Sequence, residues 1–415
     1  MASLLIKREP FIQKIRPFIG KDIVKILTGI RRCGKSVMLQ LIREELIEQG
    51  VDKGHIIAMN FDTFENGSEL NAEAVYFKVK KQAQAAGEKV YLFFDEIQEL
   101  EGWEKLANSC LTELKADIYI TGSNSKLLSG EYATYLSGRY VMFKVYPFSF
   151  NEVLTALAQT GTSGAVSPDS AISEQEAFEK YLVYGGMPFI YQSSFDDFSI
   201  QQYLRDVTDA IILKDITGRY NIRDVDQLKR LILYLFSNVG NLFSTGSVQN
   251  YLKSERRSLS WETIYNYIEY CKAAYLLLPA LQEDLSGKSL LRVNEKIYFT
   301  DHGLWQALYG NNKRDIQQIL ENIVYLELLR HDYTVTIGKI GDKEIDFVAQ
   351  KNNEKIYIQV AYLLSSPETI ERKFAVFREV KDNYPKYVLS LDEFDLSREG
   401  IRHMNIRRFL TNGWK

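Results

Sequence analysis

Thr28-Gly29-Ile30-Arg31-Arg32-Cys33-Gly34-Lys35-Ser36 is the stretch that decides the fold of this chain. It fits the pattern G-x-x-x-x-G-K-[ST] of a phosphate-binding loop. Residues 22–27 before it are rich in aliphatic side chains, which favours a buried parallel strand. After it, apolar side chains recur at helical spacing as far as Gly50, which can end a helix. The order strand, glycine loop, helix therefore predicts a site for nucleotide phosphates.

Each part of this loop has a predicted role. Its backbone N–H groups point at phosphates, and the N-terminus of the following helix adds positive potential. Lys35 would reach the β- and γ-phosphates, and Ser36 would ligate Mg²⁺. Gly29 and Gly34 permit an approach that a Cβ would obstruct. We expect the following residues to contact ATP: Gly29, Ile30, Arg31, Arg32, Cys33, Gly34, Lys35, Ser36 and Val37.

The composition is that of a globular protein, because 46% of its 415 residues are hydrophobic and 25% are charged. No apolar run approaches the roughly 18 residues of a membrane span, and the first residues are too briefly apolar for a signal peptide. We therefore expect a cytoplasmic protein without membrane association. The net charge of −3 argues against a globally basic nucleic-acid binder. The three cysteines form neither a disulfide framework nor a zinc pattern, and Cys33 is a candidate for oxidation.

Four further strands are predicted after the loop, at residues 55–61, 89–96, 117–124 and 140–145. The second of them ends in Asp95 and Glu96, which is a Walker B pattern. Asp95 would hold Mg²⁺ through water, and Glu96 would polarise the attacking water. Ser123 or Asn124 would sense the γ-phosphate or, equally well, cap the next helix. Strands alternating with helices predict a parallel sheet with the phosphate loop at the carboxyl ends of its strands.

These motifs resemble those of the AAA+ ATPases, near the archaeal and origin-initiator-like branches. More closely, the chain is similar to a bacterial and archaeal family of predicted ATPases over nearly its whole length. The shared motifs are G-I-R-R-x-G-K-S, D-E-I-Q followed by a Trp, T-G-S, L-x-G-R and G-G-x-P. Here they stand at residues 29–36, 95–98 with Trp103, 121–123, 136–139 and 185–188. The resemblance implies ATP and Mg²⁺ as cofactors, a homo-oligomer, and Arg139 as an arginine finger acting on a neighbouring subunit. The alternatives for Arg139 are an internal ion pair, with Glu131 as one candidate partner, and a surface arginine.

The middle of the chain changes pattern twice. Residues 158–174 read as a flexible insertion, and two helical runs up to residue 216 would form a lid over ATP. Helices are then expected at residues 225–239, 245–252 and 260–276, followed by strands at 277–282 and 296–300. Three helices and a hairpin predict a winged helix, whose third helix reads DNA. The alternative is a protein-docking module, with Trp261, Ile264, Tyr265 and Ile268 mostly in the core.

DNA contacts are expected from side chains on the third helix and from cations before it and on the wing. The candidate DNA-binding residues are Lys253, Arg256, Arg257, Thr263, Asn266, Tyr267, Lys288 and Arg292, with Lys296 also near the wing.

The C-terminal part follows the order helix, three strands, helix, strand, and so resembles the PD-(D/E)xK nuclease fold. Asp346 matches its first acid, and Glu321 is a second candidate. The resemblance implies a metal-binding E-x-K on the next strand, but Gln359-Val360-Ala361 stands there. Mg²⁺ prefers carboxylate oxygens, so we expect a degenerate domain that does not cleave DNA.

The expected fold is an α/β protein with an AAA+ parallel-sheet core, a helical lid, a winged helix and a restriction-endonuclease-like domain. Their expected bounds are 1–157, 158–224, 225–310 and 311–415. The expected function is a Mg·ATP-dependent ATPase that binds DNA and couples hydrolysis to DNA remodelling or repair. The alternatives are a signalling switch that regulates a protein partner and an ATP-dependent nuclease.

Overall fold

The chain divides into two compact units, which are described separately. A computed structural model describes residues 5–63, 71–87, 89–114, 116–125, 136, 138–163, 172–192, 195–255, 257, 259–287, 289–309 and 316–413. The first unit comprises Met1–Pro147 with Ala273–Tyr275. The second comprises Phe148–Lys272 and Leu276–Lys415.

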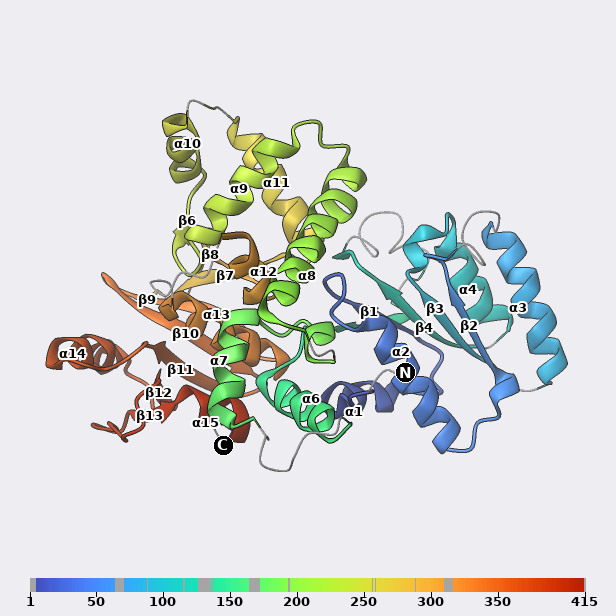
Figure 1. Cartoon of the computed structure of the whole chain (residues 1–415), viewed down its shortest axis with the longest axis horizontal. Coiled ribbons are helices and arrows are strands. Elements are labelled where there is room, and N and C mark those ends of the chain that lie inside the picture. The colour runs from blue at the N-terminus through green and yellow to red at the C-terminus, as the bar shows by residue number, and fades with distance from the viewer. Residues whose placement is uncertain are drawn as a thin grey trace. The chain divides into compact units, whose positions relative to one another are not determined.

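The first unit is built on a five-stranded sheet in the order β2-β3-β4-β1-β5, and every pairing in it is parallel. Its elements are α1 (Glu9–Ile15), β1 (Val24–Thr28), α2 (Lys35–Glu48), β2 (Ile56–Asn60), α3 (Ala72–Ala86), β3 (Tyr91–Asp95), α4 (Trp103–Glu113), β4 (Asp117–Gly122) and β5 (Tyr140–Lys144). In the blue-to-teal part of Figure 1, α3 and α4 lie side by side along this sheet. The predicted parallel sheet is therefore confirmed.

The central strand β1 explains this topology. All five of its residues are buried, as expected for a strand covered on both faces. Its register against β4 and β5 sets Thr28 opposite Gly122 and Lys144. The three strands therefore end at the same edge, where the phosphate loop begins. At the opposite edge, where these strands begin, Lys25 and Asp117 form an ion pair with both side chains fully buried.

The second unit contains one eight-stranded mixed sheet in the order β13-β12-β11-β10-β9-β7-β8-β6. Its helices are α6 (Phe150–Ser163), α7 (Glu174–Tyr184), α8 (Asp197–Ala210), α9 (Val225–Ser237), α10 (Thr245–Ser254), α11 (Trp261–Ala273), α12 (His302–Tyr309), α13 (Ile316–Arg330), α14 (Pro367–Ala375) and α15 (Ile406–Asn412). Its strands are β6 (Leu242–Phe243), β7 (Leu277–Asp284), β8 (Ser289–Phe299), β9 (Thr334–Ile340), β10 (Lys343–Lys351), β11 (Glu354–Val360), β12 (Lys386–Ser390) and β13 (Arg402–Asn405).

The hairpin β7–β8 is longer than the sequence predicts. The stretch 289–295 was expected to be a loop, but it continues the ladder, with Gln282 opposite Leu291. A register irregularity between Leu281 and Gln282 accommodates this pairing. β7 also pairs in parallel with β9, so the hairpin and the C-terminal strands share one sheet. The helices α9, α10 and α11 gather near β6 and β8 in Figure 1.

The expected C-terminal order of elements is present as α13, β9, β10, β11, α14 and β12. A core of buried side chains from β10, β11 and α14, among them Val348, Tyr357 and Phe374, holds these elements together. The helix expected at 367–380 ends at Ala375 and continues as the 3₁₀ turn Val376–Glu379. Among the described helices, none combines the length and the apolar character needed to cross a membrane.

Candidate functional site

The phosphate loop joins β1 to α2 and is held tightly against the end of β5. Val145 donates its N–H to Thr28 O at 2.7 Å. A Cβ on Gly29 would lie 2.2 Å from the carbonyl oxygen of Val145, so a larger residue does not fit there. Gly34 caps α2 with φ of +101°, a conformation that favours glycine. These constraints explain why both glycines occur in the motif.

Lys35 is buried at the start of α2, and its ammonium group has three oxygen neighbours. Nζ donates to the carbonyl oxygens of Gly29 and Ile30, each at 3.2 Å. It also lies 3.6 Å from Oε1 of Glu96. The residue predicted to bind phosphate is therefore brought together with the residue predicted to activate water. Ser36, on the next position of α2, is exposed.

The two acids lie where β3 ends. Asp95 accepts a hydrogen bond from the Thr121 hydroxyl of β4, and Asn60 of β2 donates to its other oxygen at 3.4 Å. Glu96 has φ of +50°, a left-handed conformation that costs free energy of order 1 kcal/mol in a residue with a Cβ and occurs mainly at functional sites. Its N–H is fixed by Thr121 Oγ1 at 2.9 Å. The fold thus holds both carboxylates in place.

The expected phosphate sensors lie at the end of β4. Ser123 and Asn124 are both buried. The hydroxyl of Ser123 has no hydrogen-bond partner within the part of the chain that is described. A buried hydroxyl without a partner is unfavourable, and a ligand oxygen would satisfy it. Arg139 is exposed at the start of β5, while its proposed alternative partner Glu131 lies outside the described residues.

Two properties of the loop were not expected from the sequence. Arg8 is buried and donates to Cys33 O at 3.2 Å and to Tyr146 O at 2.9 Å, and so ties the N-terminal segment to the loop. Arg8 is far from Cys33 and Tyr146 in the sequence, so no local sequence pattern predicted these contacts. Burial also raises the pKa of the Cys33 thiol, so this cysteine is protonated and shielded at neutral pH. This burial argues against the expected susceptibility of Cys33 to oxidation.

The residues fit a nucleotide with its magnesium ion. The site offers a loop packed so closely at Gly29 that no side chain fits, a buried ammonium at Lys35 and, at the end of β4, an unsatisfied hydroxyl at Ser123. Ser36, and Asp95 through water, would supply the oxygen atoms that Mg²⁺ prefers. Among the described residues, no cluster of three or more His, Cys, Asp or Glu side chains could hold a metal by itself.

The predicted DNA-binding residues are brought together only in part. Thr263 is half-buried, and its N–H is capped by Ser260 at 3.1 Å, while Asn266 and Tyr267 are also half-buried. Arg257 is ion-paired with Asp226 at 2.7 Å. Lys253 is exposed and forms no ion pair with any described residue. Arg256 and Lys288 lie outside the described residues, as does the side chain of Arg292.

Two expectations for this region are wrong. Trp261 and Tyr265 were assigned to the core in the docking alternative, but they are 65% and 54% exposed. Of the four residues in that alternative, Ile264 and Ile268 are buried, because they lie one helical turn apart on the buried stripe of α11, which continues to Cys271. Lys296 was expected near a phosphate-binding wing. It is buried instead and pairs with Glu344 of β10, since β8 continues through this position into the sheet.

A second polar site lies around Asp346 in β10, beside an irregularity in the register with β9. Asp346 Oδ2 accepts the N–H of Val360 at 2.8 Å and Nζ of Lys373 at 2.9 Å. Lys373, from α14, also donates to Oε1 of Gln359 at 2.9 Å. One buried ammonium therefore bridges the two residues that stand where the expected nuclease resemblance would place metal ligands. No spacing in the sequence pointed to Lys373.

Glu321 of α13 completes this group. Burial, together with repulsion from the Asp346 carboxylate, raises the pKa of Glu321 to about 7. Its Oε1 accepts a hydrogen bond from Gln317 at 3.1 Å. The predicted nuclease residues Glu321 and Asp346 are thus near one another, but the cation beside them is an internal lysine.

Comparison with known proteins agrees with this geometry. A family model described as an AAA domain matches residues 21–154, and a model of a domain of unknown function matches residues 175–315. The expected resemblance to AAA ATPases is confirmed at the level of an AAA domain. A solved structure of Cdc6p from Pyrobaculum aerophilum is 12% identical, covering 78% of this chain and 97% of its own, with a TM-score of 0.34. That score is too low to support an argument.

Two relatives match almost the whole chain. An uncharacterised protein of Haemophilus influenzae is 37% identical over 390 residues, which cover 94% of each chain. Uncharacterised protein MJ1544 of Methanocaldococcus jannaschii is 31% identical over 409 residues, covering 93% of this chain and 85% of its own. The chain therefore belongs to the same family as these two proteins, and an AAA domain occupies its residues 21–154.

Proposed function

We propose that this protein is an ATPase whose nucleotide site is the phosphate loop with Lys35, Ser36, Asp95 and Glu96. The observation that carries this proposal is the 3.6 Å approach of the Lys35 ammonium to the Glu96 carboxylate. A phosphate-binding cation and a carboxylate able to activate water lie at one sheet edge, which is the pairing that phosphoryl transfer to water requires.

The contact between Lys35 and Glu96 also suggests how nucleotide binding prepares the site for hydrolysis. The ammonium of Lys35 is shared between two loop carbonyls and Glu96. Phosphate oxygens carry more charge than a carbonyl and compete for this ammonium. Glu96 Oε1 is then released from Lys35 and can accept a proton from water, while Oε2 keeps its hydrogen bond from Gln98. Ser36, and Asp95 through water, would hold magnesium, which would supply positive charge to the phosphates.

Two substitutions test the nucleotide site. Lys35→Ala removes the cation from the β- and γ-phosphates, and we expect binding of a fluorescent ATP analogue to be lost. Glu96→Gln keeps the shape but cannot act as a base, so binding should persist while hydrolysis falls by roughly 100-fold or more. Phosphate release and nucleotide binding are measured on both variants. Hydrolysis at the wild-type rate by Glu96→Gln would show that Glu96 is not the base.

We also propose that the surface of α10 and α11 binds DNA and that binding stimulates the ATPase. Trp261 and Tyr265 lie one helical turn apart on the exposed face of α11, and Lys253 is exposed on α10. Exposed aromatic rings stack on bases, and lysine contacts phosphates.

The rival function is a signalling ATPase that acts on a protein partner. To distinguish the two, the rate of ATP hydrolysis is measured while duplex, single-stranded or branched DNA is titrated into the protein. Stimulation by one of these supports the DNA role.

Lys253→Glu should weaken DNA binding and lower the slope of log affinity against log salt by about 0.9 for the lost phosphate contact. Lys105→Glu is the matched control, because Lys105 is also exposed and makes no ion pair with a described residue, but lies on α4 in the other unit. Fluorescence anisotropy at several salt concentrations measures both. If the two variants bind DNA equally, the α10–α11 surface does not contact DNA and the partner role is favoured.

A further inference from the structure

The first unit has an open sheet edge at β2. This strand lies at one end of the sheet and, among the described residues, pairs only with β3. Phe61, just after it, donates its N–H to Asp95 O on the β3 side at 3.0 Å. Because successive residues of a strand direct their backbone groups to opposite sides, those of Ile56 and Ala58 point away from β3. The N–H of Ile56 already bonds the carbonyl oxygen of Lys53, so the exposed edge offers the carbonyl of Ile56 and the N–H and C=O groups of Ala58.

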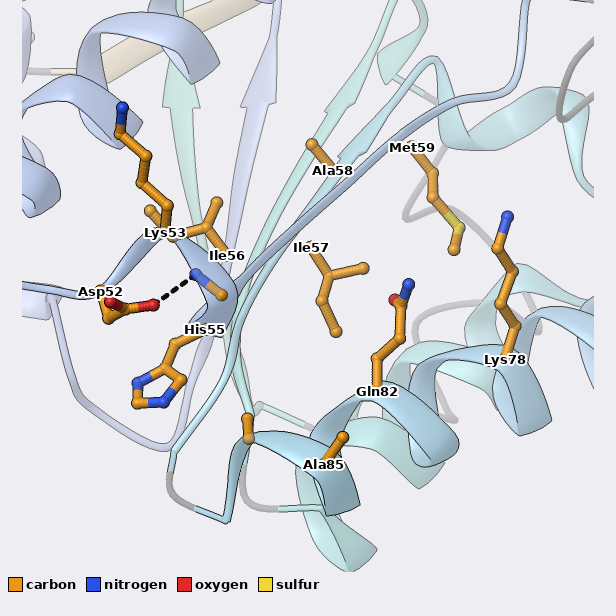
Figure 2. Close-up of a pocket in the computed structure, with 12 residues that line it drawn as sticks. Asp52, Lys53, His55, Ile56, Ile57, Ala58, Met59, Lys78, Gln82 and Ala85 are labelled. Atoms are coloured by element: carbon orange, nitrogen blue, oxygen red, sulfur yellow. Dashed lines mark hydrogen bonds between the residues drawn. The ribbon is translucent and has the colours of Figure 1, made fainter.

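A groove of about 660 Å³ runs along this edge, between β2 and α3. Figure 2 shows β2 on one side of the groove and Lys78, Gln82 and Ala85 of α3 on the other. Ala85 and Ala86 have the smallest side chains that a helix can present, which leaves room beside the strand. Five residues of an extended chain span about 17 Å at 3.3 Å per residue, which matches the length of the five-residue strand β2.

A lysine lies at each end of the groove. Lys53 lies at the end where β2 begins, and Lys78 lies near Met59 at the other end (Figure 2). Both lysines are exposed, and neither forms an ion pair with a described residue. The only carboxylate that lines the groove belongs to Asp52, and it already accepts the N–H of Gly54 at 2.7 Å. Asp52 keeps its negative charge beside Lys53, so the Lys78 end is the more positive, and two lysines against one carboxylate leave the groove with a surplus of positive charge that suits an acidic ligand.

We propose that this groove binds an extended acidic segment of a partner protein, which adds to the sheet beside β2 as a sixth strand. Strand addition pairs the carbonyl of Ile56 and both backbone groups of Ala58, and acidic side chains at the ends of the segment pair with Lys53 and Lys78. Nucleic acid is also anionic, but a phosphodiester backbone has no N–H groups for the strand carbonyls. Exposed strand edges pair readily with other chains unless they are blunted or covered, and the described residues place nothing over this one.

The proposal is tested with a phage-displayed library of random heptapeptides, panned against the full chain and counter-selected on Lys53→Glu/Lys78→Glu. We expect selected peptides to carry Asp or Glu near both ends and β-branched residues between them. In fluorescence anisotropy, a selected peptide should bind the double variant at least tenfold more weakly. Lys81→Glu, an exposed lysine of α3 outside the groove, is the matched control and should bind the peptide as the wild type does.

The backbone contribution is tested separately by Ala58→Pro. Proline lacks an N–H and is tolerated on an edge strand where that group faces away from the sheet, so the fold and the basal ATPase rate should persist while the peptide binds at least tenfold more weakly. Peptides without acidic enrichment, or equal binding to the lysine double variant, would overturn the proposal. A third outcome would also overturn it: no peptide is selected, but Lys53→Glu/Lys78→Glu abolishes self-association or DNA binding. The occupant of the groove would then be a second copy of the chain, if self-association is lost, or nucleic acid, if DNA binding is lost.

Discussion

Glu321 is a carboxylic acid whose environment favours its protonated form. Its pKa is about 7 in the folded chain against an ordinary value of 4.5, because it is buried and lies near the Asp346 carboxylate. The folded state therefore retains a proton that the unfolded state releases between these pH values. The free energy of unfolding consequently falls as pH rises from about 4.5 to 7. At about 1.4 kcal/mol per pKa unit, the loss is roughly 3 kcal/mol at most.

Glu321→Gln cannot titrate and keeps a group that can bond Gln317. We expect its stability relative to the wild type to increase between pH 5 and pH 8, as measured by urea unfolding at several pH values. Glu48→Gln, an exposed residue of α2, is the control and should leave the pH dependence unchanged. A stability difference between Glu321→Gln and the wild type that is the same at every pH would contradict the prediction.

Sequence reasoning found the residues that belong to one continuous motif and missed those that reach a site from elsewhere. Lys35 and Ser36 are adjacent within a known pattern, and Asp95 and Glu96 end a predicted strand, so their roles could be predicted. Lys373 lies 27 residues after Asp346 on another element. Its contact depends on how α14 packs over β10 and β11, and no periodicity in the sequence reports that packing.

At the scale of elements, α13, β10, β11 and α14 together argue against nuclease activity. The ammonium of Lys373 lies between Asp346 Oδ2 and Gln359 Oε1, 2.9 Å from each. A divalent cation bound by these two oxygens would be repelled by that ammonium. Gln359 also lacks the charge that a hard cation prefers. The packing of α14 thus supplies an internal cation where a cleaving enzyme needs a metal.

We therefore expect no cleavage of single-stranded, duplex or branched DNA in the presence of Mg²⁺ or Mn²⁺, as assayed on denaturing gels. Asp346→Ala is the variant that distinguishes real cleavage from a contaminant. Cutting by the wild type that is lost in Asp346→Ala would contradict the prediction, and would mean that Glu321 or Glu344 completes a metal site despite Lys373.

Element boundaries were predictable where local chemistry marks them. The strands of the first unit are bounded by glycines and acids, and the structure places them within a few residues of the predicted ranges. The pairing of β7 with β9 was not predictable, because Gln282 meets Ile337 across a long stretch of chain. A parallel partner is chosen by the packing of the whole sheet, whereas turn residues mark only the hairpin itself.

At the scale of the whole molecule, the open question is whether the ATP site is completed by a second subunit. Arg139 is exposed at the start of β5, and its backbone is fixed because its carbonyl oxygen accepts the N–H of Val24 at 2.9 Å. We propose that its guanidinium acts on the γ-phosphate of a neighbouring subunit in a homo-oligomer. Charge develops on the phosphoryl oxygens during transfer, and an arginine supplied in trans is worth about 10³-fold or more.

Arg139→Ala should therefore fold and bind ATP normally but hydrolyse it slowly. Mixing it with Lys35→Ala chains should restore part of the activity, because the intact ATP site of the first variant receives the intact arginine of the second. Phosphate release is measured across mixing ratios, with each variant alone as the control. Undiminished hydrolysis by Arg139→Ala would remove the finger role. The finger role would also be removed if the wild type, in a sample shown to be monomeric, hydrolysed ATP at a rate per chain that does not depend on protein concentration. An arginine supplied in trans requires that two subunits meet.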